Sequence, residues 1–215
     1  QLTIEAGYDN AWFTALETVY KFEKERVNAN VKLDYEINDD FSLFARVGRS
    51  STNLINDHEV GYSARRARSG QYEYEDTNSV ETNIDMLVSY TKEVGDFGIN
   101  VSAGGNSLFQ ESSYSYTGGA PIVVPGLFTG SNIDRGGLTY ITNHFDKRVY
   151  SVYGLGSFSY KNFAYLDVTA RNDWSSTLPE DNRSYFYPSA SLSILLSEMF
   201  EMPEAISFLK IRGGW

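Results

Sequence analysis

Alternation of apolar and polar residues is the dominant pattern of this chain. From Val27 to Ile37 every second residue is apolar, and polar or charged residues stand between them. The same period of two returns in residues 41–48, 83–91 and 97–104. Successive side chains of a β-strand point to opposite faces, so this period predicts strands with one apolar and one polar face.

Two further strands flank a polar loop between residues 164 and 196. The apolar face of the first arm holds Ala164, Leu166, Val168 and Ala170, opposite Tyr165, Asp167, Thr169 and Arg171. The second arm places Phe186, Pro188, Ala190, Leu192, Ile194 and Leu196 opposite Tyr187, Ser189, Ser191 and Ser193. Residues 149–160 also form a strand, but its facing stays open because Val152, Phe158 and Tyr160 compete with Tyr153 and Leu155. With a last strand at 208–215, about eight strands are expected.

The lengths of the connections also alternate along the chain. Tight turns are predicted at residues 38–40, 93–96 and 161–162, and long loops at 50–79, 112–146 and 174–184. Residues 1–22 are predicted as a loop with a short strand at 2–6, and residues 198–205 as an interruption before the last strand. Antiparallel strands joined in this way place all short turns at one end and all long loops at the other, which is typical of an outer-membrane barrel.

Charged residues on the polar strand faces favour a water-filled interior. Lys32, Asp34 and Glu36 share one face of their strand, and Arg46 follows on the next. Unpaired charges cost several kcal/mol each in a dry core. The fold class predicted is therefore all-β, an antiparallel transmembrane β-barrel segment with its apolar faces toward outer-membrane lipid. The alternative that remains open is a secreted soluble β-sandwich that binds carbohydrate or mediates adhesion.

Composition excludes several classes of function. The formal net charge of −10 argues against nucleic acid, and the lack of cysteine excludes disulfide scaffolds and thiolate metal sites. No apolar run approaches the ~20 residues of a transmembrane helix. His58 and His144 fall in predicted loops without a third metal ligand, and Gly154-Leu155-Gly156 lacks the third glycine of a dinucleotide fingerprint. No catalytic, cofactor or metal site is expected, so the chain is not predicted to be an enzyme.

Several motifs resemble one family in the same order along the chain. Residues 167–193 contain Thr169 to Pro179 (TARNDWSSTLP) and Asn182 to Ser189 (NRSYFYPS), which resemble the signature barrel segment of SusC/RagA-type TonB-linked outer-membrane transporters of the Bacteroidetes. Weaker support comes from residues 101–106, 124–127, 147–154 and 209–215.

The resemblance implies an importer of oligosaccharides or peptides in the outer membrane. Such transporters have a 22-stranded barrel closed by a plug, pair with a SusD-like surface lipoprotein and draw energy from TonB. Residues 1–215 show no recognisable plug domain or TonB box and are expected to be an internal slice of the barrel. Trp215 imitates the aromatic last residue of an outer-membrane protein, but the family pattern continues beyond it.

Aromatic residues in the predicted outer loops are the candidate contacts for substrate or lid, because sugar rings and peptides stack on exposed rings. They are Trp12, Tyr62, Tyr72, Tyr74, Tyr114, Tyr116, Phe128 and Trp174. The alternative for each ring is packing within the loops or membership of the interfacial aromatic girdle. Arg65, Arg66 and Arg68 form a basic run that is expected to be solvated.

Overall fold

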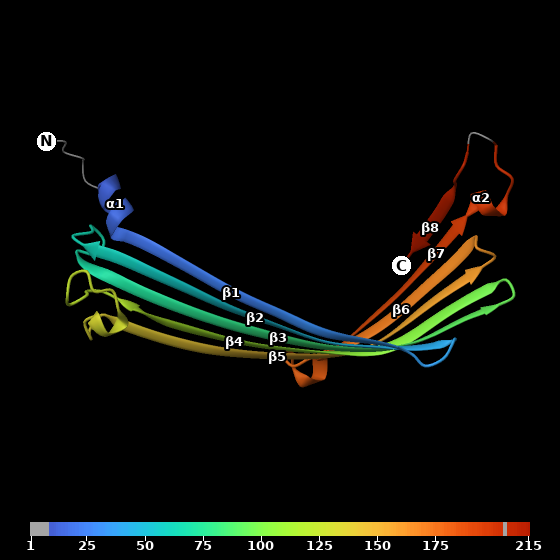
Figure 1. The fold of residues 1–215 in the computed structure, drawn as a ribbon, viewed down its shortest axis with the longest axis horizontal. Helices are drawn as coiled ribbons and strands as arrows, with labels where there is room; N and C mark the ends of the chain where they lie inside the picture. The colour runs from blue at the N-terminus through green and yellow to red at the C-terminus, as the bar shows by residue number, and fades with distance from the viewer. Residues whose placement is uncertain (1–8, 204–205) are drawn as a thin grey trace. The chain divides into compact units, whose positions relative to one another are not determined.

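Long β-strands make up most of the protein. A computed structural model describes residues 9–203 and 206–215, and its eight strands form one sheet in the order β1-β2-β3-β4-β5-β6-β7-β8 (Figure 1). The strands are β1 (Thr18–Glu36), β2 (Phe41–Tyr62), β3 (Ser69–Val94), β4 (Phe97–Gly119), β5 (Leu138–Tyr160), β6 (Ala164–Ser175), β7 (Ser184–Leu195) and β8 (Lys210–Gly214). The predicted all-β class and strand number are confirmed, while the short strand predicted at residues 2–6 lies outside the described residues.

Short helices accompany the strands. They are α1 (Ala11–Glu17), α2 (Leu196–Met199) and the 3-10 turns η1 (Gly130–Asn132) and η2 (Glu180–Asn182). Asn10 caps α1 by accepting a hydrogen bond from the Trp12 amide at 2.9 Å. Among the described residues, no helix has the length and apolar character needed to span a bilayer.

The pairing register fixes which side chains share a face. Leu166 lies opposite Phe158 of β5 and Leu192 of β7, whereas Asp167 lies opposite Ser157 and Ser191. Directly opposed residues of an antiparallel pair project from the same face. The two faces predicted for β6 and β7 are therefore confirmed.

The same register settles the facing of β5. Val152, Phe158 and Tyr160 share the apolar face of β6, because they lie opposite Asn172, Leu166 and Ala164. The competing residues project to the polar face: Tyr153 lies opposite Arg171 and Leu155 opposite Thr169. One apolar position, Leu155, thus sits on a mostly polar face, which is why the sequence pattern alone was ambiguous.

The apolar face has no protein cover within the described residues. Val31 is 74% exposed and Phe186 is 63% exposed, although both belong to regularly alternating strands. All eight strands lie in one sheet, so the two-sheet sandwich considered above is wrong. An apolar surface of this extent needs another apolar phase to cover it.

Tight turns occur where they were expected. Lys161 and Asn162 both have positive φ, 47° and 59°, as in the two-residue turns that match the twist of a hairpin. The turn after β1 is held by Asn38, whose Oδ1 accepts hydrogen bonds from the amides of Asp40 and Phe41 at 3.0 and 2.9 Å. Gly95, also at positive φ, lies between β3 and β4.

The predicted loops are much shorter than expected, and this is a correction. Most of residues 50–79 belong to β2 and β3, and residues 112–146 include the end of β4 and the start of β5. Residues 11–22 are also regular, as α1 and the start of β1. The connections predicted as long loops are reduced to residues 63–68, 120–137 and 176–183. Each still exceeds the tight turns in length. The hairpin from β7 to β8 departs from the alternation, because α2 and residues 200–209 connect these two strands.

The chain divides into two compact units that cut across the strands. The first contains the described part of Gln1–Asn28 together with Ser50–Val80 and Glu111–Asp146. The second contains Ala29–Arg49, Glu81–Gln110 and the described part of Lys147–Trp215. The second unit holds the strand segments with regular apolar–polar alternation, and the strand segments of the first unit lack that alternation.

Candidate functional site

The strand segments of the first unit extend beyond what a membrane requires. A transmembrane strand needs about 9–11 residues. The strands β6 and β7 have 12 residues each, but β2 has 22 and β3 has 26. The additional residues lie where apolar alternation stops, in segments such as Asn56-Asp57-His58-Glu59 and Gln71-Tyr72-Glu73. These segments therefore lack the continuous apolar face that a lipid-facing strand segment needs.

A hydrogen-bonded network connects three of these strands. The Nδ1 atom of His58 on β2 lies 3.0 Å from Oε2 of Glu73 on β3. The other carboxylate oxygen of Glu73 accepts hydrogen bonds from Gln71 Nε2 at 2.7 Å and from the Tyr116 hydroxyl on β4 at 3.2 Å. We call the sheet face that carries this network the His58 face.

A second set of contacts lies beside the first on the same face. Glu75 accepts a hydrogen bond from Asn56 Nδ2 at 2.9 Å and from the Tyr114 hydroxyl at 3.2 Å. The ring of Tyr20 from β1 stacks on His58 with 3.9 Å between centroids and an angle of 11° between planes. The His58 face therefore presents alternating carboxylates, amides and aromatic rings across four strands.

The charged face of the second unit also carries a cross-strand pair. There Arg46 of β2 donates to Asp85 of β3 through Nη2 at 2.6 Å. In the first unit, Asn56 and His58 of β2 contact Glu75 and Glu73 of β3, so each unit has contacts between even positions of β2 and odd positions of β3.

Electrostatics keep Glu73 charged and Tyr116 neutral. Burial by itself would raise the pKa of Glu73, but the hydrogen bonds from His58, Gln71 and Tyr116 outweigh burial and leave that pKa below its ordinary value. Burial, followed by the charge of Glu73 and the hydrogen bond to it, raises the pKa of the Tyr116 hydroxyl to about 12. Around neutral pH, the Glu73 carboxylate therefore acts as acceptor and the Tyr116 hydroxyl as donor.

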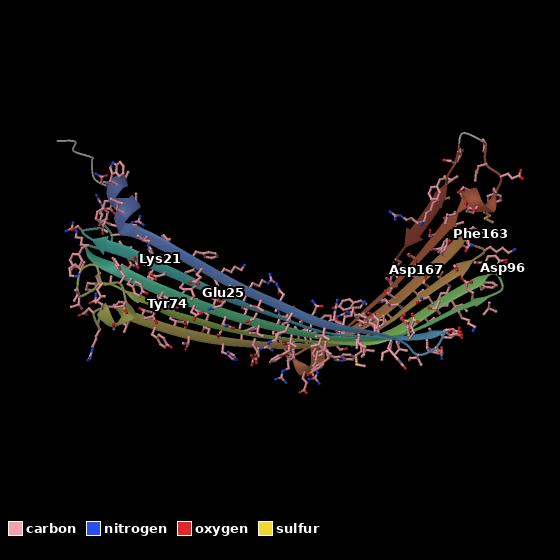
Figure 2. All side chains as sticks on the ribbon, viewed as in Figure 1. Lys21, Glu25, Tyr74, Asp96, Phe163 and Asp167 are labelled. Atoms are coloured by element: carbon pink, nitrogen blue, oxygen red, sulfur yellow. The ribbon has the colours of Figure 1, made fainter. Side chains whose placement is uncertain are left out.

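The opposite face of the first unit is structural. Tyr72 is 8% exposed and packs with Ile122 and Ile133, while Tyr74 and Phe128 pack against this cluster. Figure 2 labels Lys21 and Glu25 of β1 and Tyr74 of β3 among the side chains of these strands. Lys21 forms an ion pair with Glu59, and the hydrogen bond that Lys21 donates to the Glu59 carboxylate raises the pKa of Lys21.

One buried asparagine organises the connection from β4 to β5. Asn132 Nδ2 donates to the carbonyl oxygens of Val124 at 2.8 Å and Leu127 at 2.6 Å. Its Oδ1 accepts from the Val124 amide at 3.0 Å. With Ile122 only 1% exposed, residues 120–137 form a fixed cap over the Tyr72 side of the sheet.

The predicted contact residues separate into distinct environments. Tyr114 and Tyr116 join the His58 face, and Tyr72, Tyr74 and Phe128 form the cluster that anchors residues 120–137. Trp12 is exposed on α1, Tyr62 ends β2, and Trp174 lies opposite Tyr150 on the apolar face.

Their predicted placement in loops is wrong for seven of the eight. Tyr62, Tyr72, Tyr74, Tyr114, Tyr116 and Trp174 are strand residues, and Trp12 belongs to α1. The predicted loop position of His58 is wrong as well, since it lies within β2. The pattern Tyr114-Ser115-Tyr116 already has the period of a strand, but polar neighbours on both sides hide it.

Several residues of the His58 face were not identified from the sequence. Tyr20, Asn56, Glu73 and Glu75 became visible only when the strands were paired. The alternating polar side chains of Gln71, Glu73 and Glu75 were the available signal. No group of three metal-ligating side chains occurs in the described part of the chain.

Comparison with known proteins identifies the architecture. The model of the family described as "TonB dependent receptor-like, beta-barrel" matches residues 3–213. The chain belongs to this family. The sandwich alternative is thereby excluded on sequence as well as on strand topology, and the resemblance to TonB-linked transporters is confirmed.

Relatives and solved structures agree with the family. TonB-dependent receptor P3 of Formosa agariphila is 24% identical over 193 residues, which cover 86% of this chain and 19% of the receptor. A structure of the RagAB peptide transporter matches with a TM-score of 0.85 at 15% identity, covering 94% of this chain and 23% of that one. The ferric preacinetobactin receptor BauA of Acinetobacter baumannii matches with a TM-score of 0.55 at 16% identity, covering 91% and 30%. The chain thus spans about a fifth to a third of these proteins.

Proposed function

We propose that this chain forms part of the wall and extracellular rim of a TonB-dependent outer-membrane importer for oligosaccharides or peptides. The observation that carries the proposal is the change along each long strand, from a segment with regular apolar–polar alternation to a segment without it. A soluble protein has no need of an uncovered apolar strand face. A barrel confined to the bilayer has no need of strands that continue after that apolar face ends.

The edges of the sheet support a larger barrel. The strands β1 and β8 are the outermost strands in the described order, and β1 has 19 residues. Exposed edge groups in hydrocarbon cost several kcal/mol each, because lipid offers no hydrogen-bond partners. Further strands must pair with both edges, in agreement with a 22-stranded barrel in which residues 1–215 are one portion.

The His58 face is the substrate-contacting surface in this proposal. Its carboxylates and amide groups suit the hydroxyls of sugars and the backbone groups of peptides, and the exposed ring of Tyr20 offers a stacking surface. Tyr114 and Tyr116 keep the role predicted for them. Tyr72, Tyr74 and Phe128 serve instead to hold the cap at residues 120–137.

A SusD-like surface lipoprotein is the proposed lid, and TonB the proposed energy source through parts of the protein outside residues 1–215. The exposed ring of Trp12 on α1 and the ring of Tyr62 at the end of β2 stand near the strand ends that a lid would reach.

Uptake by the full-length protein in its outer membrane tests the proposal. We expect accumulation of fluorescent peptides or oligosaccharides that stops when a protonophore collapses the proton-motive force. Replacing Tyr20 by Ala should weaken substrate binding, whereas the matched change Phe22→Ala, on the same face of β1 but outside the network, should have a smaller effect. A full-length protein that is monomeric in water without detergent would contradict the proposal.

A further inference from the structure

A basic pocket lies on the apolar side of the sheet, at the end of β5 and β6 next to residues 176–183. Its volume is about 410 Å³, and its lining consists of Arg148, Tyr150, Trp174, Ser175, Ser176 and Arg183. Two guanidinium groups beside a lipid-facing surface stand out in a chain with a net charge of −10.

The position of the pocket is fixed by strand pairing. Tyr150 lies directly opposite Trp174, on the face that carries Phe158 and Leu166. Tyr150 is 53% exposed and Trp174 is 37% exposed. Tyr and Trp at the end of an apolar strand face mark the level of the lipid head groups in outer-membrane barrels. The pocket therefore lies where the hydrocarbon ends.

The arginines are held in place from several directions. The amide of Arg148 donates to Ser176 Oγ at 2.9 Å, and the Ser176 amide donates to the Arg148 carbonyl oxygen at 2.9 Å. The Arg148 guanidinium lies 4.9 Å from the ring centroid of Phe109. The carbonyl oxygen of Arg183 accepts a hydrogen bond from the Ser175 amide at 3.1 Å. The Nη2 atom of Arg183 lies 3.8 Å from Oε1 of Glu180, which is too long for a strong ion pair.

We infer that this pocket binds the phosphate of a phosphorylated glycolipid in the outer leaflet. Two arginines offer charge-assisted hydrogen bonds to one phosphate, and Tyr150 and Trp174 pack beside the acyl region below it. The inference rests on the proposed membrane position of the apolar face. It assigns Trp174 to lipid instead of substrate or lid.

The test uses full-length protein in detergent and measures lipid binding by native mass spectrometry. Three probes are compared: a phosphorylated lipid A-type glycolipid, the same lipid after phosphatase treatment, and inorganic phosphate. The variants are Arg148→Gln with Arg183→Gln, and the control pair Arg65→Gln with Arg66→Gln in the 63–68 connection. A difference in gel migration between unboiled and boiled samples reports whether each barrel has folded.

We expect the phosphorylated lipid to bind the unaltered protein and the control pair equally. The pocket pair should bind it at least roughly tenfold more weakly, as loss of charge-assisted hydrogen bonds predicts. Equal binding of the dephosphorylated lipid, or unchanged binding by the folded pocket pair, would overturn the inference. Competition by inorganic phosphate at lipid concentrations would also overturn it and indicate a free-anion site. Failure of the membrane assignment is seen separately, as a protein that needs no detergent.

Discussion

His58 on β2 and Glu73 on β3 lie 3.0 Å apart, between Nδ1 and Oε2, in strand segments that the sequence pattern assigned to a loop. This pair joins two strands, and Tyr20 and Tyr116 contact it from the strands on either side. These segments are therefore ordered sheet, and substrate and lid are proposed to meet them there.

Glu73 makes the stability of this region sensitive to acid. The pKa of Glu73 is lowered from its ordinary 4.5, so the folded state binds its proton less readily than the unfolded state. The stabilisation is therefore present above about pH 4.5 and is lost as the pH falls through the lowered pKa. The free energy of unfolding, measured with urea at several pH values, should fall over this range. The fall should be smaller in the Glu73→Gln variant. An identical pH dependence in both proteins would rule out the assignment.

Tyr116 should titrate unusually late. Its pKa of about 12 arises first from burial and then from the negative charge of Glu73. Glu73→Gln should move the pKa of Tyr116 down toward its ordinary value of 10.0 but not fully to it, because burial remains. The difference in tyrosinate absorbance between each protein and its Tyr116→Phe variant gives the titration. Glu23→Gln on exposed β1 is the control, and a Tyr116 pKa that ignores Glu73 contradicts the network.

The faces of β1 can be separated by two adjacent substitutions. Val31→Arg places a charge on the lipid side and should cost about 2–4 kcal/mol near the midplane, reducing the amount of folded barrel. Lys32→Gln removes a charge from the water-filled side and should be tolerated. Heat-modifiable gel migration of membrane fractions measures both. Equal tolerance of the two changes would invalidate the facing.

The cap at residues 120–137 depends on Ile122. Ile122→Ala removes a side chain that is nearly fully buried, and comparable core truncations cost about 2–5 kcal/mol. We expect faster proteolysis within 120–137 while the barrel stays folded. Val123→Ala, at the exposed neighbouring position, should leave the rate unchanged. A cap equally resistant in both variants would mean that the Tyr72 cluster does not hold it.

Periodicity was a reliable guide wherever a strand separates lipid from water. In β6, Leu166 and Asp167 differ so strongly that sequence alone assigned both faces correctly. In residues 50–62 and 69–80 one face carries the His58 network and the other lies partly under residues 120–137, so neither face is regularly apolar and alternation disappears although the strands continue. The facing of β5 required its register with β6, because Leu155 lies on the polar side. Contacts such as Asn132 with Val124 and Leu127 join residues within an irregular connection, which no periodic pattern describes.

Site-directed spin labelling along β6 tests the membrane placement most directly. The chain has no cysteine, so single cysteines can be introduced at residues 166 to 170 of a full-length protein otherwise free of cysteine and labelled in lipid bilayers. We expect collisions with oxygen to dominate at Leu166, Val168 and Ala170, and collisions with a water-soluble nickel complex to dominate at Asp167 and Thr169. High accessibility to the nickel complex at all five positions would contradict a lipid-facing sheet.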